Sequence, residues 1–288
     1  MKTINELIDI LTLDKIGDNE FQGDSEYIGS PIVFGGQVLA QAVHAAYQTV
    51  SKTRFLHSLH SYFLEPGNLE IPIRFRVEET RNGGSFSTRR VKAMQNEKTI
   101  FILAASFHVQ EEGYEHQIEM PQNLKQPEDL LSWDDIVAKF GGFLPKSMKT
   151  FLSIERPIEF KPTEIPNPAV QKNLPPKENV WFRLKGNSGE LEVALKHQIL
   201  TYISDYNILN AAINPNASVA NWGNLQTASL DHSMWFFRDF DVEDWLLFSA
   251  ESPSSFGARG LSRGNIFTRN GILVASFAQE GLLRPISS

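Results

Sequence analysis

The sequence predicts an α+β fold of two similar halves, each built around one long buried helix and a set of antiparallel strands. Two stretches, 37–50 and 191–206, carry apolar residues at helical spacing. Each is followed by short apolar or alternating runs separated by turn residues, which is typical of antiparallel strands. A helix followed by such strands is a unit whose sheet can wrap the helix.

The composition is that of a globular protein and excludes several classes of function. The chain has 288 residues, of which 41% are hydrophobic and 21% charged. A net charge of −7 without any Lys/Arg run argues against a nucleic-acid binder. The sequence contains no cysteine, so disulfides, thiolate metal sites and a cysteine nucleophile are excluded.

The sequence also lacks the usual signals for export or membrane insertion. Acidic residues interrupt the apolar residues of the first 21 positions, so this segment is not the apolar region of a signal peptide. No apolar run approaches the roughly 18–20 residues that span a bilayer. We therefore expect a cytoplasmic protein without a membrane span.

The first half is predicted to contain two helices and a series of strands. A short amphipathic helix is expected at 5–13, and a glycine pair, Gly35-Gly36, precedes the long helix at 37–50. These glycines would let the helix pack closely against another backbone. The strands are expected at 21–28, 55–64, 71–79, 86–95 and 99–109.

A proline-rich connector is predicted between the halves. Nine of the fifteen prolines lie between Pro121 and Pro176. We predict an N-terminal repeat at 1–115, a connector at 116–152, and a C-terminal repeat at 153–288 that carries the active site. A short helix is expected at 130–140, and the many apolar residues of the connector predict that it packs on the two repeats.

The second half is predicted to repeat the order of elements in the first. Asn187 or Ser188 is expected to cap the helix at 191–206. The strands are expected at 154–160, 180–184, 226–237, 245–251, 256–269 and 271–281.

Short motifs support an internal duplication. The Ser-Phe pair and arginine at Ser85, Phe86 and Arg89 return 170 residues later, as does the Ala-Ser-Phe run that starts at Ala105. The pair His60-Ser61 returns 172 residues later as His232-Ser233. Several matches in one order indicate a tandem repeat, and sites are expected where the two halves meet.

These features together resemble a known family. A helix wrapped by an antiparallel sheet and duplicated in tandem is similar to the double hotdog fold. The phrases FGGQVLAQA, LHSYFLEPG, RNGGSFSTRRV, LDHSMWF, FGARG and ASFAQEG resemble the acyl-coenzyme A thioesterase II family. The resemblance extends from about Phe21 to Leu283. It implies an enzyme that hydrolyses fatty acyl-CoA to free fatty acid and coenzyme A, without a metal or redox cofactor.

The residues favour a water-mediated hydrolysis. The chain has no G-x-S-x-G sequence, since the nearest string, 83–87, lacks the final glycine. Without a serine elbow or a cysteine, hydrolysis needs a positioned water, a base and donors for the oxyanion, unless a carboxylate attacks directly.

Three residues are candidates for this chemistry, and the resemblance implies that they are catalytic. Asp205 is expected inside a buried helix, where it could also cap a helix break or pair with an arginine. Ser229 stands where the family usually has threonine, and it could instead be an ordinary serine at a strand entry. Gln279 could accept from the water and donate to an oxyanion, or be an exposed glutamine at a strand end.

Other polar residues are assigned structural roles. Asp231 and His232 are neighbours on a predicted strand and point to opposite faces, so they cannot easily act on one atom. Because His60 matches His232 in the repeat, we expect both histidines to have a packing role. His57 and His60 lack a third ligand for a metal. Four arginines could contact coenzyme A phosphates, form internal pairs or be surface charges: Arg89, Arg90, Arg259 and Arg263.

We expect one site per chain, centred on the second half, because Gln110 is displaced by one residue from the place that matches Gln279. The acyl chain is predicted to lie in an apolar tunnel beside the central helix, lined by Trp235, Phe236 or connector aromatics. A homo-oligomer is expected. Two alternatives stay open, a hydratase or dehydratase of the same fold and a non-catalytic acyl-CoA binder.

Overall fold

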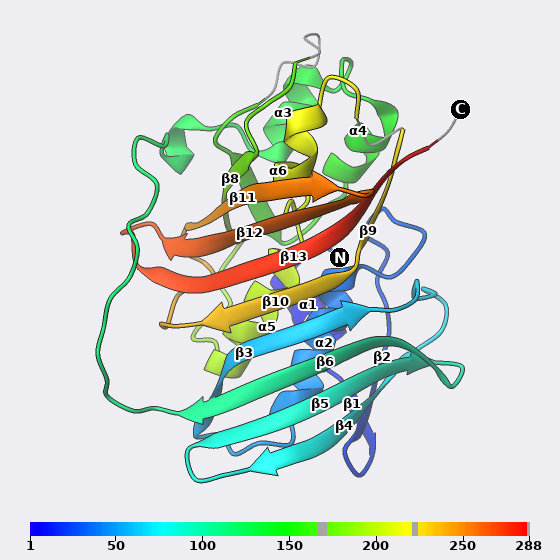
Figure 1. Cartoon of the computed structure of the whole chain (residues 1–288), viewed down its shortest axis with the longest axis vertical. Coiled ribbons are helices and arrows are strands. Elements are labelled where there is room, and N and C mark those ends of the chain that lie inside the picture. Colours follow the sequence, from blue (N-terminus) through cyan, green and yellow to red (C-terminus); the bar gives the residue numbers. More distant parts are fainter. Residues whose placement is uncertain (166–171, 221–223, 287–288) are drawn as a thin grey trace.

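The computed structural model describes residues 1–165, 172–220 and 224–286. One large, curved antiparallel sheet runs through the molecule, and the two long helices lie behind it in Figure 1. The helices are α1 (Ile4–Leu11), α2 (Gly35–Tyr47), α3 (Trp133–Phe140), α4 (Lys146–Leu152), α5 (Val193–Ser204) and α6 (Asn210–Ile213).

The strands of the first half are β1 (Asp14–Gly17), β2 (Glu20–Gly23), β3 (Arg54–Phe63), β4 (Ile73–Asn82), β5 (Phe86–Gln95) and β6 (Lys98–Val109). The later strands are β7 (Ile158–Pro162), β8 (Lys177–Leu184), β9 (Leu225–Ser229), β10 (Asp231–Phe236), β11 (Leu246–Phe256), β12 (Arg259–Thr268) and β13 (Leu273–Pro285).

The two halves join through a central pair of strands. The sheet order is β1-β2-β4-β5-β6-β3-β10-β13-β12-β11-β8-β7, with β9 paired to β13. At the junction, β3 and β10 are antiparallel, with Ser61 opposite His232 and His60 opposite Ser233. The predicted arrangement of two helix-and-sheet units is therefore confirmed, and the seam between them runs beside His232.

The long helix α2 is buried along nearly its whole length, as its composition predicts. Its residues from Gly36 to Ala46 are all buried, and it packs against α5. At Gly36, an added Cβ would lie 2.5 Å from the carbonyl oxygen of Tyr202 in α5, a distance that no side chain tolerates. The expected close approach of backbones at this glycine is confirmed, and it brings the start of α2 to the end of α5.

The connector packs on the molecule through aromatic residues. The capping box of Ser132 and Asp135 begins α3. Trp133, the first residue of α3, stacks on Phe160 of β7 with ring centroids 4.3 Å apart. Phe160 also contacts Tyr206, which follows the end of α5. As predicted, the connector is part of the folded core, and it covers the segment that follows α5.

Two predicted strands differ from the observed ones. Instead of a strand at 21–28, β1 and β2 form a hairpin whose turn contains Asn19 with a φ of 54°. The expected strand at 226–237 divides at Leu230 into β9 and β10. The Leu230 backbone donates to Glu280 and accepts from Phe63. The chain therefore bends where β9, which pairs with β13 alone, gives way to β10, which pairs with β13 and β3. Ser229 lies at this bend.

The offset of 170 residues between the repeated motifs does not match structurally equivalent residues. Arg89 lies within β5 opposite Ala105, whereas Arg259 is the first residue of β12 and pairs with Leu282. Counted from the middle of the preceding hairpin, Arg89 matches Ser262, which lies opposite Gln279. Gln279 therefore occupies the position of Ala105 in the first half.

Candidate active site

The three candidate residues converge at the C-terminal end of α5. Asp205 caps this helix, Ser229 ends β9, and Gln279 lies within β13. The Ser229 hydroxyl donates to Asp205 Oδ1 at 3.3 Å, and the Gln279 Nε2 donates to Ser229 Oγ at 2.8 Å. These residues come from three separate segments, and the hydrogen bonds join them into one polar cluster.

Asp205 lies at the end of α5, whereas the sequence predicted a position inside the helix. It is the C-cap of α5, and the left-handed Asn207, with a φ of 62°, turns the chain away after it. A carboxylate at a helix C-terminus meets the negative end of the helix dipole, which is unfavourable. The backbone N–H of Gly36, in the first turn of α2, donates to Asp205 Oδ2 at 2.8 Å. The start of one helix thus stabilises a carboxylate at the end of the other.

The carboxyl group of Asp205 has a raised pKa. Burial disfavours its charged form and raises the pKa from 3.8 to about 6, while hydrogen bonds from Gln279, the Gly36 N–H and Ser229 oppose the rise. The group is therefore ionised at neutral pH and close to the range in which it can accept and return a proton.

Gln279 is buried, whereas an exposed strand end was one interpretation of its sequence. It is 1% exposed, because β13 continues to Pro285 and the side chain faces the helices. Its Oε1 is engaged by Nδ1 of His232, so the amide presents its N–H groups to Ser229 and Asp205. The Gln279 oxygen has a second lone pair beside the one that His232 uses, so the expectation that it accepts a hydrogen bond from water stays a prediction.

The two histidines of the repeat do not share a role. His232 is completely buried, while the ring of His60 is exposed on the other face of the sheet. There His60 Nδ1 contacts Ser233 Oγ at 3.1 Å, and its ring lies against Trp235. The offset of 172 matched His60 with His232, although these two side chains point to opposite faces of the sheet. The strand register matches His232 with Leu59 instead.

Asp231 and His232 point to opposite faces, as predicted. The Asp231 carboxylate accepts from the backbone N–H of Glu280 at 2.8 Å, away from the cluster. His232 faces the helices and contacts Gln279 and Ser204. Sequence reasoning missed this contact of His232 with a candidate residue, and it also missed Ser204 and Gly36. The alternation of faces along β10 and β13 was the signal that could have found His232.

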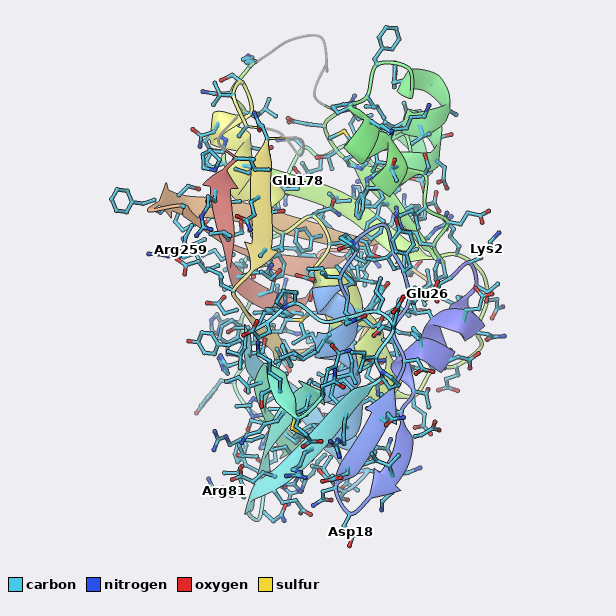
Figure 2. All side chains as sticks on the ribbon, turned by 90° about the vertical axis from the view of Figure 1, so that its right-hand side faces the viewer. Lys2, Asp18, Glu26, Arg81, Glu178 and Arg259 are labelled. Carbon is cyan, nitrogen blue, oxygen red and sulfur yellow. The ribbon has the colours of Figure 1, made fainter. Side chains whose placement is uncertain are left out.

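The four candidate arginines divide into one internal and three exposed residues. Arg89 is 1% exposed and donates to the carbonyl oxygen and hydroxyl of Thr49, so it is an internal partner and cannot meet phosphates. Exposed arginines form ion pairs with glutamates: Arg90 with Glu78, Arg259 with Glu280 and Arg263 with Glu251. Figure 2 shows Arg259 at the outer edge of the molecule.

One cleft lies on the face of the sheet opposite the cluster. This cleft has a volume of about 580 Å³ and is lined by Trp235, Arg263 and Ser276, among others. Trp235 therefore does not line a tunnel beside the helices, because it alternates with the inward-facing Met234 and Phe236. Phe236 packs against His197 of α5, with ring centroids 4.5 Å apart. Within the described ranges, no group of three or more His, Cys, Asp and Glu residues could hold a metal ion.

Comparisons with known proteins agree with this architecture. Residues 23–108 match the family model of the acyl-CoA thioesterase N-terminal domain, and residues 147–282 match that of acyl-CoA thioesterase. Acyl-CoA thioesterase 2 of Haemophilus influenzae is 40% identical over 281 residues, which is 98% of each chain. The chain belongs to the acyl-CoA thioesterase II family.

Other members and solved structures cover the same length. Human acyl-coenzyme A thioesterase 8 is 36% identical over 96% of this chain and 88% of its own. An acyl-CoA thioesterase II of Mycobacterium marinum shares 35% identity and a TM-score of 0.77 over 97% of this chain and 98% of its own. A hot dog fold protein of Alicyclobacillus acidocaldarius, at 15% identity, has a TM-score of 0.77 over 98% of this chain and 99% of its own. The predicted family and the double hotdog fold are confirmed.

Proposed function

We propose that this thioesterase II chain hydrolyses fatty acyl-CoA to a free fatty acid and coenzyme A, with a water activated by Asp205, Ser229 and Gln279. The observation that carries the proposal is the hydrogen-bonded convergence of these residues beside the start of α2. Family membership supports the reaction class, and the geometry supports the roles.

Asp205 is the proposed general base. Its pKa of about 6 leaves the carboxylate ionised at neutral pH and still basic enough to take a proton from water. The attacking oxygen then forms a bond to the thioester carbonyl carbon. When the carbon–sulfur bond breaks, the leaving thiolate takes the proton that Asp205 received, so protons balance over one turnover.

Ser229 and Gln279 are proposed to hold the water and to stabilise developing negative charge. The Ser229 hydroxyl lies between the carboxylate and the amide, within 3.3 Å of the first and 2.8 Å of the second. The positive end of the α2 dipole at Gly35-Gly36 points at the same place. A serine nucleophile is disfavoured, because His232 contacts Gln279 and not Ser229.

The remaining properties are proposed from the family and the sequence. We propose one active site per chain, a cytoplasmic homo-oligomer, and no binding of nucleic acid. Within the part of the chain that the structure describes, no helix is long and apolar enough to cross a membrane.

Thiol release from acyl-CoAs of increasing chain length tests the proposal. The intact chain is expected to release free coenzyme A, at a rate that rises with pH through about 6 as Asp205 ionises. If substrate binds without any thiol release, the protein is an acyl-CoA binder. If an enoyl-CoA is consumed while its thioester stays intact, the protein is a hydratase.

A further inference from the structure

We propose that His232 is a positioning residue that sets the orientation of the Gln279 amide, and that Ser204 supports the required tautomer of His232 by donating to its Nε2. The proposal rests on the proposed function and adds to it two residues that do not touch the substrate. Its basis is a chain of hydrogen bonds that starts in α5, passes through β10 and β13, and ends at Asp205.

His232 is buried between Gln279 and Ser204 and contacts both. The side chain is 0% exposed, its Nδ1 contacts Gln279 Oε1, and its Nε2 lies 3.0 Å from Ser204 Oγ. Both ring nitrogens are thus occupied by uncharged partners. The backbone is held as well, since the Ser61 hydroxyl donates to the His232 carbonyl oxygen at 2.8 Å across the seam between the halves.

The direction of each hydrogen bond follows from Asp205. An ionised carboxylate only accepts, so the Gln279 amide must turn its N–H groups toward Asp205 and Ser229. The amide oxygen then faces His232, and Nδ1 must carry the hydrogen. Burial lowers the His232 pKa to about 4, so at neutral pH the ring carries one hydrogen and Nε2 accepts.

Ser204 supplies the hydrogen that Nε2 requires. Its hydroxyl lies 3.0 Å from His232 Nε2 and 2.8 Å from the carbonyl oxygen of Thr201. One hydroxyl hydrogen serves one acceptor at a time, and donation to Nε2 completes the chain in the required direction. Ser204 directly precedes Asp205, so the end of α5 contributes both the proposed base and the hydroxyl that hydrogen-bonds to His232.

Loss of His232 would leave the amide free to reverse. In the reversed orientation, the amide oxygen would face the carboxylate of Asp205 and would repel its charged form. The first half shows the apolar alternative, since Leu59 and Ala105 fill the matching positions. An imidazole next to a glutamine in one half thus corresponds to leucine next to alanine in the other.

The pKa of Asp205 reports the amide orientation. The groups that act on this carboxyl are Gln279, Ser229 and the Gly36 N–H, all of which lower its pKa, and Tyr206 is the titratable neighbour next in sequence. Asp231 faces away and accepts from Glu280. If the amide loses its fixed orientation, one donor is lost and the pKa of Asp205 rises.

The test compares His232→Leu with His232→Asn. Leucine is the residue at the matching position of the first half, and the Asn side-chain N–H can take the place of Nδ1–H. For His232→Leu we expect kcat to fall about 10–100-fold, as for partners that orient catalytic groups. KM should stay within about twofold of wild type. The acid limb of the kcat–pH profile, where kcat rises with pH, should move to higher pH. His232→Asn should restore most of kcat and the original acid limb.

Matched variants separate positioning from folding. Met234→Leu changes a buried residue on the same strand without touching the cluster, and it should leave kcat and the acid limb unchanged. If His232→Leu does not fold, Ser204→Ala provides the second measurement. We expect a loss of about three- to tenfold in kcat, with a smaller shift of the acid limb in the same direction.

Two results would overturn the proposal. One is a folded His232→Leu variant whose kcat and acid limb equal those of wild type. If His232→Leu does not fold, the same result in Ser204→Ala overturns the proposal. The other is a His232→Asn variant that performs no better than His232→Leu. Failure of the proposed function looks different, since the wild-type chain would then release no thiol, or Asp205→Asn would retain full activity.

Discussion

The inner faces of the two halves carry matching positions with opposite chemistry. In the first half, Leu59, Ala105 and Arg89 lie side by side across β3, β6 and β5. In the second half, the corresponding residues on β10, β13 and β12 are His232, Gln279 and Ser262. One row is apolar and closed by an arginine, and the other is polar and reaches the candidate site.

The helix ends above these rows differ in the same way. After α2 ends, Arg89 donates to the Thr49 carbonyl oxygen at 2.7 Å, so a cation meets the negative end of the helix dipole. After α5 ends, the carboxylate of Asp205 lies where a cation would be favourable. The first half thus uses this place for stability, and the second half holds an unfavourable charge there, which is typical of a functional site.

The largest effect is expected when the unfavourable charge is removed. Asp205→Asn should lower kcat by about 10³-fold, because the amide cannot accept a proton from water. Folding raises the pKa of this carboxyl from 3.8 to about 6, so its contribution to stability is full below pH 4 and is lost as pH rises through 6. At pH 8 the variant should therefore be more stable than wild type, by up to about 3 kcal/mol. Thiol release and urea unfolding measure both changes.

Arg89 provides the test for the first half, where a cation lies at the favourable end of the α2 dipole. Arg89→Ala should destabilise the protein by about 3 kcal/mol, because it removes a buried side chain together with its hydrogen bonds to Thr49 and its ion pair with Glu79. The kcat of the folded variant should not change. Arg259→Ala is the control, since Arg259 is 51% exposed and should contribute no more than about 0.5 kcal/mol. Equal unfolding midpoints for the two variants in urea would contradict this difference between the halves.

Gln279→Ala introduces the residue found at the matching position of the first half. We expect a loss of about 10²-fold in kcat, because the donors to Ser229 and Asp205 disappear. Gln110→Ala is the matched control, since Gln110 is exposed beyond the end of β6 and should have no effect. Full activity of Gln279→Ala in the thiol-release assay would remove Gln279 from the mechanism.

The smallest expected effect concerns Ser229. Ser229→Ala should lower kcat about tenfold, because Asp205 and Gln279 lose the hydroxyl that links them. Ser229→Thr keeps the hydroxyl and adds one methyl, so its kcat should stay within about threefold of wild type. A threonine variant as impaired as the alanine variant would show that space, and not the hydroxyl, matters at the bend between β9 and β10.

Much of the fold could be predicted because it depends on local patterns. The composition around Gly35 and Gly36 predicted a buried helix in close contact with a backbone, and alternation predicted most strands. The register of the repeat could not be predicted, because identical motifs lie at different positions along the matching hairpins. Phe86 begins β5 after the β4–β5 turn, whereas Phe256 ends β11 before the β11–β12 turn. The predicted boundaries of the connector, 116 and 152, stay a prediction.

The sequence by itself determined the fold class, the duplication, the family and the three candidate residues, since each depends on patterns or phrases that are read along the chain. Only the tertiary structure decided how these residues act on one another. The raised pKa of Asp205 depends on burial and on donors from three segments, among them the Gly36 N–H of another helix. The contact of His232 with Gln279 depends on which face of β10 and β13 each side chain takes. A shift of one residue in register would separate them, so no local pattern could have predicted the contact.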